Sequence, residues 1–271
     1  MSPMQILRRL LRGLSQNVVI RKRLPSSLGG GVVFCSPASM LSIWKPGWRS
    51  KQALGLLDWA RRFVRRDMCV WDVGANQGIF AFAASAMAGS GGLIVAFEPD
   101  LFLVDLLRRS TVSGTHAGAP VRILPLAVGS EQCIAEFVIA RTDRALNHLA
   151  SSSGNPRTGG ERDRTLVSCT SMDWLIGQIR QPDIVKIDIE GAELSALRGA
   201  GRLLSEVRPL LIIEVAPENA AAIAELLGAH GYAMCDVRDH SRVCRRLPAW
   251  NTLAWPSEKS WELDELRARI R

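Results

Sequence analysis

From residue 68 onward, short apolar runs alternate with longer stretches of helical periodicity. The apolar runs cover residues 69–73, 93–97, 121–124, 184–188 and 210–215, with two weaker runs at 232–237 and 251–255. Between them, apolar residues recur at helical spacing over residues 79–87, 101–113, 193–204 and 218–230. Continuous Val, Ile and Leu runs separated by helices are typical of a parallel sheet covered on both faces. The pattern therefore predicts a doubly wound α/β domain.

Two stretches depart from this alternation. Residues 25–57 are rich in Pro, Gly and Trp and lack the periodicity of long elements, and one helix is expected over residues 52–65. Residues 133–170 fit a β-hairpin or another excursion, and within them residues 141–164 are polar and without apolar periodicity. Such a stretch in a compact domain is either a lid or binding loop, or a disordered segment.

The positive charge of the chain lies in its N-terminal quarter. The chain has 34 Lys and Arg against 26 Asp and Glu, a net charge of +8, but residues 1–66 hold 13 of the bases and a single acid, Asp58. The remainder has more acids than bases, which argues against a catalytic body built as a polyphosphate-binding surface. These boundaries predict three parts: a basic N-terminal arm and pre-domain at 1–66, the α/β domain at 67–257 and a charged helical tail at 258–271.

The first residues carry an amphipathic pattern. On a helix, Met4, Leu7, Leu11 and Leu14 form an apolar stripe beside arginines, but the apolar residues are interrupted too often for a secretory or spanning segment. The stripe fits either a packing helix or frayed arm, or a helix lying on an anionic membrane surface. The six cysteines contain no C-x-x-C pair, so we expect reduced, structural thiols and a cytoplasmic protein, with peripheral membrane contact through the N-terminus as the open alternative.

Candidate chemistry begins at the end of the first apolar run. There the sequence reads Asp72-Val73-Gly74-Ala75-Asn76-Gln77-Gly78 and leads into the first helix, a place where ligands bind in open parallel sheets. The spacing differs from the G-x-G-x-x-G loop that cradles a pyrophosphate, and the acid Asp72 would repel that group. The loop better suits a cofactor with an ammonium and no phosphate, and S-adenosylmethionine has an amino-acid tail, a sulfonium and an adenosine. The alternative is a strand-to-helix turn without a ligand.

Two further strand ends carry acids. The second run ends in Phe97-Glu98-Pro99, and in dinucleotide folds a carboxylate at this strand tip binds ribose hydroxyls. The run at 184–188 leads through Lys186, Asp188 and Glu190 at alternate positions, which places all three on one side of the chain at the same sheet edge. The alternative for this group is a structural salt-bridge cluster in which Lys186 neutralises one carboxylate.

Taken in order, these stretches resemble the FkbM family of S-adenosylmethionine-dependent methyltransferases. The resemblance covers residues 70–215. Its motifs are D-V-G-A-N-x-G at 72–78, F-E-P at 97–99, L-A-V-G at 126–129, T-S-M-D-W-L at 170–175, K-I-D-I-E-G-A-E at 186–193, L-R-G-A at 197–200, and R-P at 208–209 before I-I-E at 212–214. The K-I-D-I-E-G-A-E run is the most specific of them.

The resemblance implies a class I methyltransferase fold, which is Rossmann-like, with seven mostly parallel strands, helices on both faces and the last strand antiparallel. It also implies a cofactor site: Asp72, Gly74, Ala75, Asn76 and Gly78 beside the methionine and sulfonium, Glu98 and Pro99 at the ribose, and Leu126 and Ala127 at the adenine. The implied reaction methylates a hydroxyl of a sugar, a glycolipid or polysaccharide, or a natural product. The expected partner is therefore a small-molecule or glycan acceptor.

Such a reaction needs a group that removes the proton of an alkyl hydroxyl. Asp188 is the expected base, with Glu190 and Lys186 beside it, and Glu214 and His148 are further candidates. No metal site is predicted, although carboxylate oxygens at this edge suit a divalent cation.

Three other classes of protein stay open. The basic arm favours a nucleic-acid methyltransferase, but no Asn-Pro-Pro-Tyr-like motif follows the run at 184–188. The glycine spacing argues against a nicotinamide oxidoreductase. A non-catalytic scaffold with a retained cofactor pocket is disfavoured because Asp72, Glu98 and Asp188 are all intact.

Overall fold

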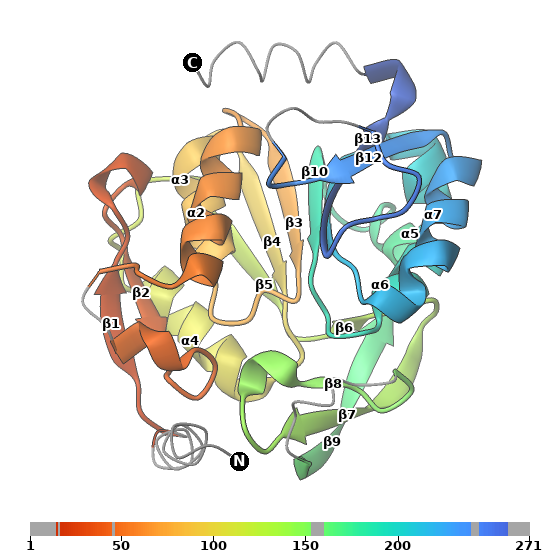
Figure 1. Cartoon of the computed structure of the whole chain (residues 1–271). Helices are drawn as coiled ribbons and strands as arrows, with labels where there is room; N and C mark the ends of the chain where they lie inside the picture. Colours follow the sequence, from red (N-terminus) through yellow and green to blue (C-terminus); the bar gives the residue numbers. More distant parts are fainter. Residues whose placement is uncertain (1–14, 16, 45–46, 153–159, 240–243, 260–271) are drawn as a thin grey trace.

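The computed structural model describes residues 15, 17–44, 47–152, 160–239 and 244–259. Its centre is a seven-stranded sheet with helices on both sides, and a smaller sheet lies beyond one end of it (Figure 1). Two predictions fall outside the described residues: the apolar stripe from Met4 to Leu14, and the tail beyond residue 259. None of the described helices combines the length and apolar character needed to cross a membrane.

The main sheet has the strand order β12-β13-β11-β10-β3-β4-β5. In chain order its strands are β3 (Cys69–Val73), β4 (Leu93–Phe97), β5 (Val121–Leu124), β10 (Ile184–Ile187), β11 (Leu210–Glu214), β12 (Tyr232–Asp236) and β13 (Asn251–Pro256). Neighbours from β11 to β5 are parallel, and β13 is antiparallel to both β11 and β12. The predicted class I fold, with seven strands and an antiparallel last strand, is confirmed.

Side chains of the central strands alternate between two hydrophobic cores. Val70 and Ile184 belong to one core, which also contains side chains of α2 and α3, whereas Trp71 and Val185 belong to the other, with side chains of α5, α6 and α7. Because both faces are covered, the strands read as continuous apolar runs. The helices are α2 (Lys51–Phe63), α3 (Ile79–Ala88), α4 (Leu101–Val112), α5 (Met172–Leu175), α6 (Glu193–Arg198) and α7 (Ala220–Ala229).

The helix predicted over residues 193–204 is interrupted. It ends at Arg198, and a separate π-helical turn, η5 (Leu203–Val207), follows. A Cβ on Gly199 would lie 2.4 Å from the carbonyl oxygen of Gly129, so the chain passes another backbone at a distance that only glycine permits. Helical periodicity in the sequence does not report a contact of this kind.

The segment ahead of the main sheet packs against the helices on one of its faces. β1 (Ile20–Arg23) and β2 (Val32–Cys35) pair antiparallel, and the backbone N–H of Phe34 donates to Ser110 Oγ of α4 at 2.9 Å. Side chains of β2 and α2 belong to the same hydrophobic core as β3 and α3. The boundary at residue 66 stays a prediction, and the described part of the N-terminal segment shares its core with the sheet.

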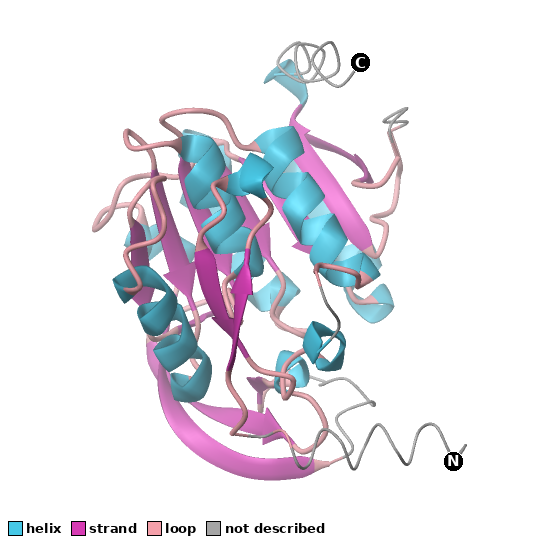
Figure 2. Ribbon diagram, turned by 90° about the vertical axis from the view of Figure 1, so that its left-hand side faces the viewer, coloured by secondary structure: helices cyan, strands magenta, loops and turns pink. Residues whose placement is uncertain are grey.

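The predicted hairpin between residues 133 and 170 is present. β7 (Cys133–Ala140) and β9 (Glu161–Thr170) pair antiparallel, β8 (His148–Leu149) adds to β7, and β6 (Ala127–Val128) adds to β9. This small sheet lies at the lower end of the molecule in Figures 1 and 2. The polar stretch 141–164 supplies the 3-10 turn η3 (Arg144–Leu146), β8 and the start of β9, and its residues 153–159 lie outside the described part.

Candidate active site

The loop between β3 and α3 depends on two glycines. Gly74 has φ +78° and Gly78 has φ +84°, which are left-handed values that favour glycine. A Cβ on Gly74 would lie 1.9 Å from the carbonyl oxygen of Asp188, and one on Gly78 would lie 2.6 Å from Leu107 of α4. The loop therefore closes against both neighbours only because these two residues have no side chains.

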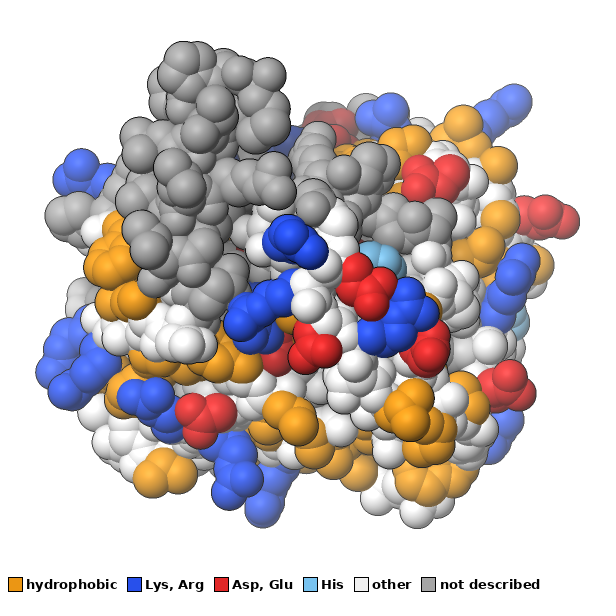
Figure 3. Space-filling view, turned by 90° about the horizontal axis from the view of Figure 1, so that it is seen from below, with side chains coloured by type: hydrophobic (Ala, Val, Ile, Leu, Met, Phe, Trp, Pro, Cys, Tyr) orange, Lys and Arg blue, Asp and Glu red, His pale blue; other side chains and the backbone are white. Residues whose placement is uncertain are grey.

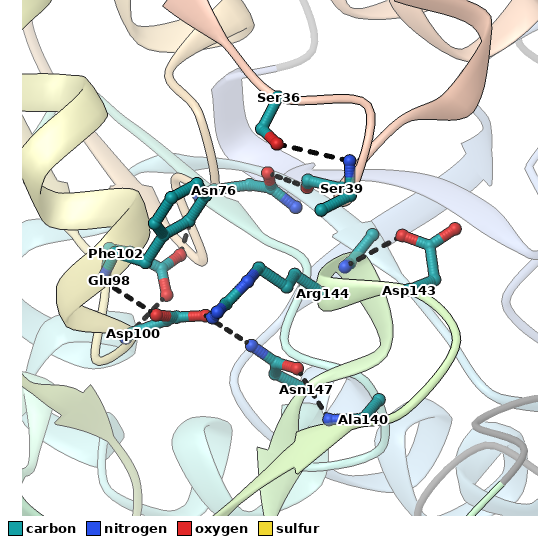
Figure 4. Close-up of polar contacts among 12 residues, drawn as sticks. Ser36, Ser39, Asn76, Glu98, Asp100, Phe102, Ala140, Asp143, Arg144 and Asn147 are labelled. Atoms are coloured by element: carbon teal, nitrogen blue, oxygen red, sulfur yellow. Dashed lines mark hydrogen bonds and ion pairs between the residues drawn. The ribbon is translucent and has the colours of Figure 1, made fainter. Parts of the chain in front are cut away.

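Asn76 ties the loop to its surroundings (Figure 4). It has φ +52°, which asparagine tolerates better than most residues, and its backbone N–H donates to Glu98 Oε2 at 2.8 Å. Its Oδ1 accepts from the backbone N–H of Gln77 at 2.8 Å and from the hydroxyl of Ser39. The backbone N–H of Ser36 donates to Gln77 Oε1 at 2.8 Å. The N-terminal segment thus holds the loop, through contacts for which the sequence carries no motif.

Glu98 follows β4 and is 5% exposed. Its Oε2 accepts from the N–H of Asn76 at 2.8 Å, and its Oε1 accepts from the N–H of Asp100 at 2.9 Å. Burial raises the pKa of this carboxyl to about 8, against the opposing effect of the two backbone donors. Glu98 is thus a buried acceptor at the tip of the second strand, and each oxygen keeps a lone pair for a further donor such as a hydroxyl.

Asp72 and Lys186 form a buried ion pair beneath the loop. Lys186 Nζ lies 3.0 Å from Asp72 Oδ1 and 3.1 Å from the carbonyl oxygen of Gly74, and the side chains of Asp72 and Lys186 are 0% and 4% exposed. Burial raises the pKa of Asp72. Burial opposes the charge of Lys186 as well, but nearby carboxylates, Asp72 first among them, outweigh it and raise the pKa of Lys186. Both residues therefore support the loop from beneath.

Three carboxylates gather at the ends of β10 and β11. Asp188, Glu190 and Glu214 each offer an oxygen, and these oxygens lie within 4.8 Å of one another. Burial, followed by the charges of Asp188 and Glu190, raises the pKa of Glu214 to about 9. Asp188 Oδ2 also lies 3.7 Å from Lys186 Nζ. Oxygens in this arrangement suit proton transfer, and they also suit a hard divalent cation.

One pocket joins the predicted groups. Eight of the predicted site residues line it: Gly74, Asn76, Glu98, Pro99, Leu126, Ala127, Asp188 and Glu190. Four others lie outside its lining: Asp72, Ala75, Gly78 and Lys186. The small sheet and the η3 turn that joins two of its strands supply residues that the sequence did not single out: Phe137, Arg144, Ala145, Asn147 and Leu149. His148 lies outside the lining, with Nδ1 3.1 Å from the carbonyl oxygen of Leu146.

The described pocket lining contains three acidic residues and one basic residue. Glu98, Asp188 and Glu190 are the acids, and Arg144 is the cation. This excess of acids would repel a pyrophosphate and attract an ammonium or a sulfonium. Together with the acceptor Glu98 and the apolar side chain of Leu126, the lining fits S-adenosylmethionine. Figure 3 shows the lower side of the molecule, where acidic and basic side chains gather between hydrophobic patches.

Asp100 fastens the small sheet to the main domain (Figure 4). As the N-cap of α4, its Oδ1 accepts from the N–H of Phe102 at 2.9 Å. Its Oδ2 accepts from Arg144 Nη1 at 2.5 Å and from Asn147 Nδ2 at 2.8 Å, while the backbone N–H of Arg144 donates to the carbonyl oxygen of Ala38 at 2.9 Å. The polar composition of residues 141–164 fits either a lid or binding loop or a disordered segment, and nothing in its pattern distinguishes Arg144 from the other arginines there.

Known proteins resemble this chain in sequence and fold. The hexuronic acid methyltransferase AglP of Haloferax volcanii is 29% identical over 175 residues, which are 62% of this chain and 65% of that protein, so the match spans less than two thirds of this relative. The crystal structure of a methyltransferase FkbM from Methylobacillus flagellatus KT has 18% identity and a TM-score of 0.42, covering 73% of this chain and 50% of that one. The T. thermophilus 16S rRNA N2 G1207 methyltransferase has 13% identity and a TM-score of 0.47, covering 88% and 50%. The sequence model of the methyltransferase FkbM domain matches residues 72–234, more than half of the chain, and the chain therefore belongs to the FkbM methyltransferase family.

Proposed function

We propose that this chain transfers the methyl group of S-adenosylmethionine to a hydroxyl of a sugar or glycan acceptor. The observation that carries the proposal is that the glycine loop, Glu98 and two carboxylates at the end of β10 line the same pocket. Membership of the FkbM family supports methyl transfer. The name of the relative AglP, a hexuronic acid methyltransferase, supports a sugar acid as the acceptor class.

In this proposal, one half of the pocket holds the cofactor. Backbone groups of residues 74–78 bind the amino-acid tail, Glu98 accepts hydrogen bonds from the ribose hydroxyls beside Pro99, and Leu126 and Ala127 contact the adenine. Asp72 acts through Lys186, whose Nζ holds the carbonyl oxygen of Gly74. The bound cofactor supplies an electrophilic methyl group.

The other half of the pocket aligns the acceptor. Displacement at a sulfonium is in-line, so the protein has to position the hydroxyl and take its proton. Asp188 lines this half and receives the proton, and Glu190 lies beside it. Glu214, with its pKa raised to about 9, stays protonated at neutral pH and donates a hydrogen bond. The different environments of the carboxylates thus divide the roles of base and donor.

Two further parts of the proposal concern partners. A nucleic-acid acceptor has less support, because acids outnumber bases among the described residues that line the pocket. A location in the cytoplasm and peripheral contact with an anionic membrane through the basic N-terminus remain proposals, and most of that terminus lies outside the described residues.

The test is methyl transfer from tritiated S-adenosylmethionine to a panel of acceptors. The panel contains glycans ending in a uronic acid, the matching neutral glycans, and transfer RNA. We expect label in a glycan, and loss of this label in Asp188→Asn but not in the matched variant Asp105→Asn, whose carboxylate is 63% exposed on α4. Label in the RNA, or equal turnover by Asp188→Asn and the wild type, would refute the proposal.

A further inference from the structure

The guanidinium of Arg144 is the one cation of the described pocket lining, and the proposed function has given it no task. It reaches the pocket from η3, the turn between β7 and β8, and the side chain is only 10% exposed. Figure 4 shows its side chain extending to the carboxylate of the N-cap residue Asp100. A charged group held this deep in a ligand pocket is a candidate for ligand recognition.

The contacts of Arg144 occupy one edge of the guanidinium and one of its faces. Nη1 donates to Asp100 Oδ2, and Cζ lies 4.5 Å from the centre of the Phe102 ring. These contacts fix the plane of the group. Nε is buried and has no hydrogen-bond partner among the described residues. A buried donor without a partner is rare and destabilising, so this edge is expected to meet an acceptor when the pocket is filled.

The carboxylate of Asp100 is poorly placed to accept a hydrogen bond from Nε of Arg144 as well. Its Oδ1 accepts from the N–H of Phe102 at the start of α4, and its Oδ2 accepts from both Arg144 and Asn147. The carboxylate is therefore held on the Nη1 side. On the edge made by Nε and Nη2, the described residues offer Nε no acceptor, and two parallel donors on one edge match the two oxygens of a carboxylate.

We propose that the Nε edge of Arg144 binds a carboxylate of a molecule in this pocket. The inference rests on the proposed function, which offers two sources of that group: the acid of a sugar-acid acceptor and the amino-acid end of the cofactor. A carboxylate fits better than a phosphate, because the carboxylates of Asp188 and Glu190 also line the pocket and would repel a dianion more strongly. Arg144 is then a specificity-determining residue for a charged ligand.

Binding to purified protein tests this inference with paired probes, of which only one member carries a carboxylate. For the cofactor, the pair is S-adenosylhomocysteine and 5′-methylthioadenosine, which lacks the amino-acid end. For the acceptor, the pair is D-glucuronate and D-glucose, titrated into protein saturated with S-adenosylhomocysteine. The variants are Arg144→Gln and Arg144→Lys, because lysine keeps a cation for Asp100 but lacks the two-donor edge. The matched control is Arg164→Gln, an exposed arginine of β9 that pairs with Glu136 and Glu161.

Loss of a charge-assisted pair predicts affinity that is weaker by roughly 10- to 100-fold for the carboxylate probe and unchanged for its partner. Such a loss with S-adenosylhomocysteine assigns the carboxylate to the cofactor, and a loss confined to D-glucuronate assigns it to the acceptor. Thermal melting confirms that the variants are folded. If folded Arg144→Gln and Arg144→Lys show no selective loss in either pair, the proposal is overturned. Failure of the wild type to bind S-adenosylhomocysteine would instead refute the proposed function.

Discussion

Replacing Lys186 with methionine should destabilise the fold by about 3–5 kcal/mol, because Asp72 would remain buried without its partner. The two charged atoms lie 3.0 Å apart, and at an effective dielectric constant of about 20 two unit charges at this distance attract by about 5.5 kcal/mol. Methionine keeps the length and most of the volume of lysine, so packing changes little. Proton uptake by Asp72 in the variant limits the loss, which places the expected value at the lower end of the range at neutral pH.

Urea unfolding at pH 7 measures this effect. Asp72→Asn and the double variant Asp72→Asn/Lys186→Met complete a double-mutant cycle for the ion pair. For a protein of this size, Lys186→Met should lower the melting temperature by roughly 10 °C, and the double variant should lose less than the sum of the single variants. The control is Arg202→Met, since Arg202 and its partner Glu206 are 61% and 55% exposed and such a pair contributes at most about 1 kcal/mol. If Lys186→Met unfolds within 1 kcal/mol of the wild type, the buried pair does not stabilise the loop as described.

Substitutions at Gly74, Asp188, Glu214 and Ser50 should change stability or turnover in different ways. Gly74→Ala should lower the free energy of unfolding, measured in urea, by roughly 2 kcal/mol or more, because its Cβ would lie 1.9 Å from the carbonyl oxygen of Asp188. The control Gly55→Ala, whose Cβ would lie in open space on α2, should stabilise the protein by up to about 1 kcal/mol. Asp188→Asn should leave the affinity for S-adenosylhomocysteine unchanged and lower turnover by roughly 10²- to 10⁴-fold, which calorimetry and a methyl-transfer assay measure separately. The pKa of Glu214 is about 9 in the folded protein and about 4.3 in the unfolded chain, so only the folded state holds this proton between these values. Wild-type stability should therefore fall relative to Glu214→Gln as pH rises from 6 to 9, with a slope of at most about 1.4 kcal/mol per pH unit. Parallel stability curves for the two proteins would contradict this assignment. Ser50→Ala should destabilise α2 by about 1 kcal/mol in urea unfolding, because Ser50 Oγ accepts from the third backbone N–H of that helix.

Most of the main sheet can be predicted from the sequence because its strands are buried on both faces. A run such as residues 69–73 is buried at every position, so its apolar composition alone marks a strand. β1 is different: it reads Ile-Arg-Lys-Arg, with alternating half-buried and exposed side chains. Its stability depends on pairing with β2 and on the contact with α4, and neither is visible in local composition.

Some residues of the candidate site can likewise be predicted from the sequence, and others cannot. Gly74, Glu98 and Asp188 stand at strand ends within recognisable motifs, so both the residues and their meeting point can be predicted. Ser39 and Arg144 reach the same place from segments that carry no motif, through hydrogen bonds to Asn76 and Asp100. Contacts that depend on how distant segments fold back cannot be predicted from spacing alone. The same limit explains why Asp72, which the motif assigns to the cofactor, lies beneath the loop with Lys186.

Calorimetric titration of S-adenosylmethionine into the wild type and Glu98→Ala decides whether the pocket beside Glu98 binds the cofactor. We expect one site per chain in the wild type and affinity weaker by at least about tenfold in Glu98→Ala, because the variant lacks the buried acceptor at the tip of β4. Glu136→Ala, which removes a carboxylate that is 53% exposed on β7, should bind as the wild type does. Equal affinity in the wild type and Glu98→Ala, or no binding to the wild type, would contradict a cofactor site at this pocket.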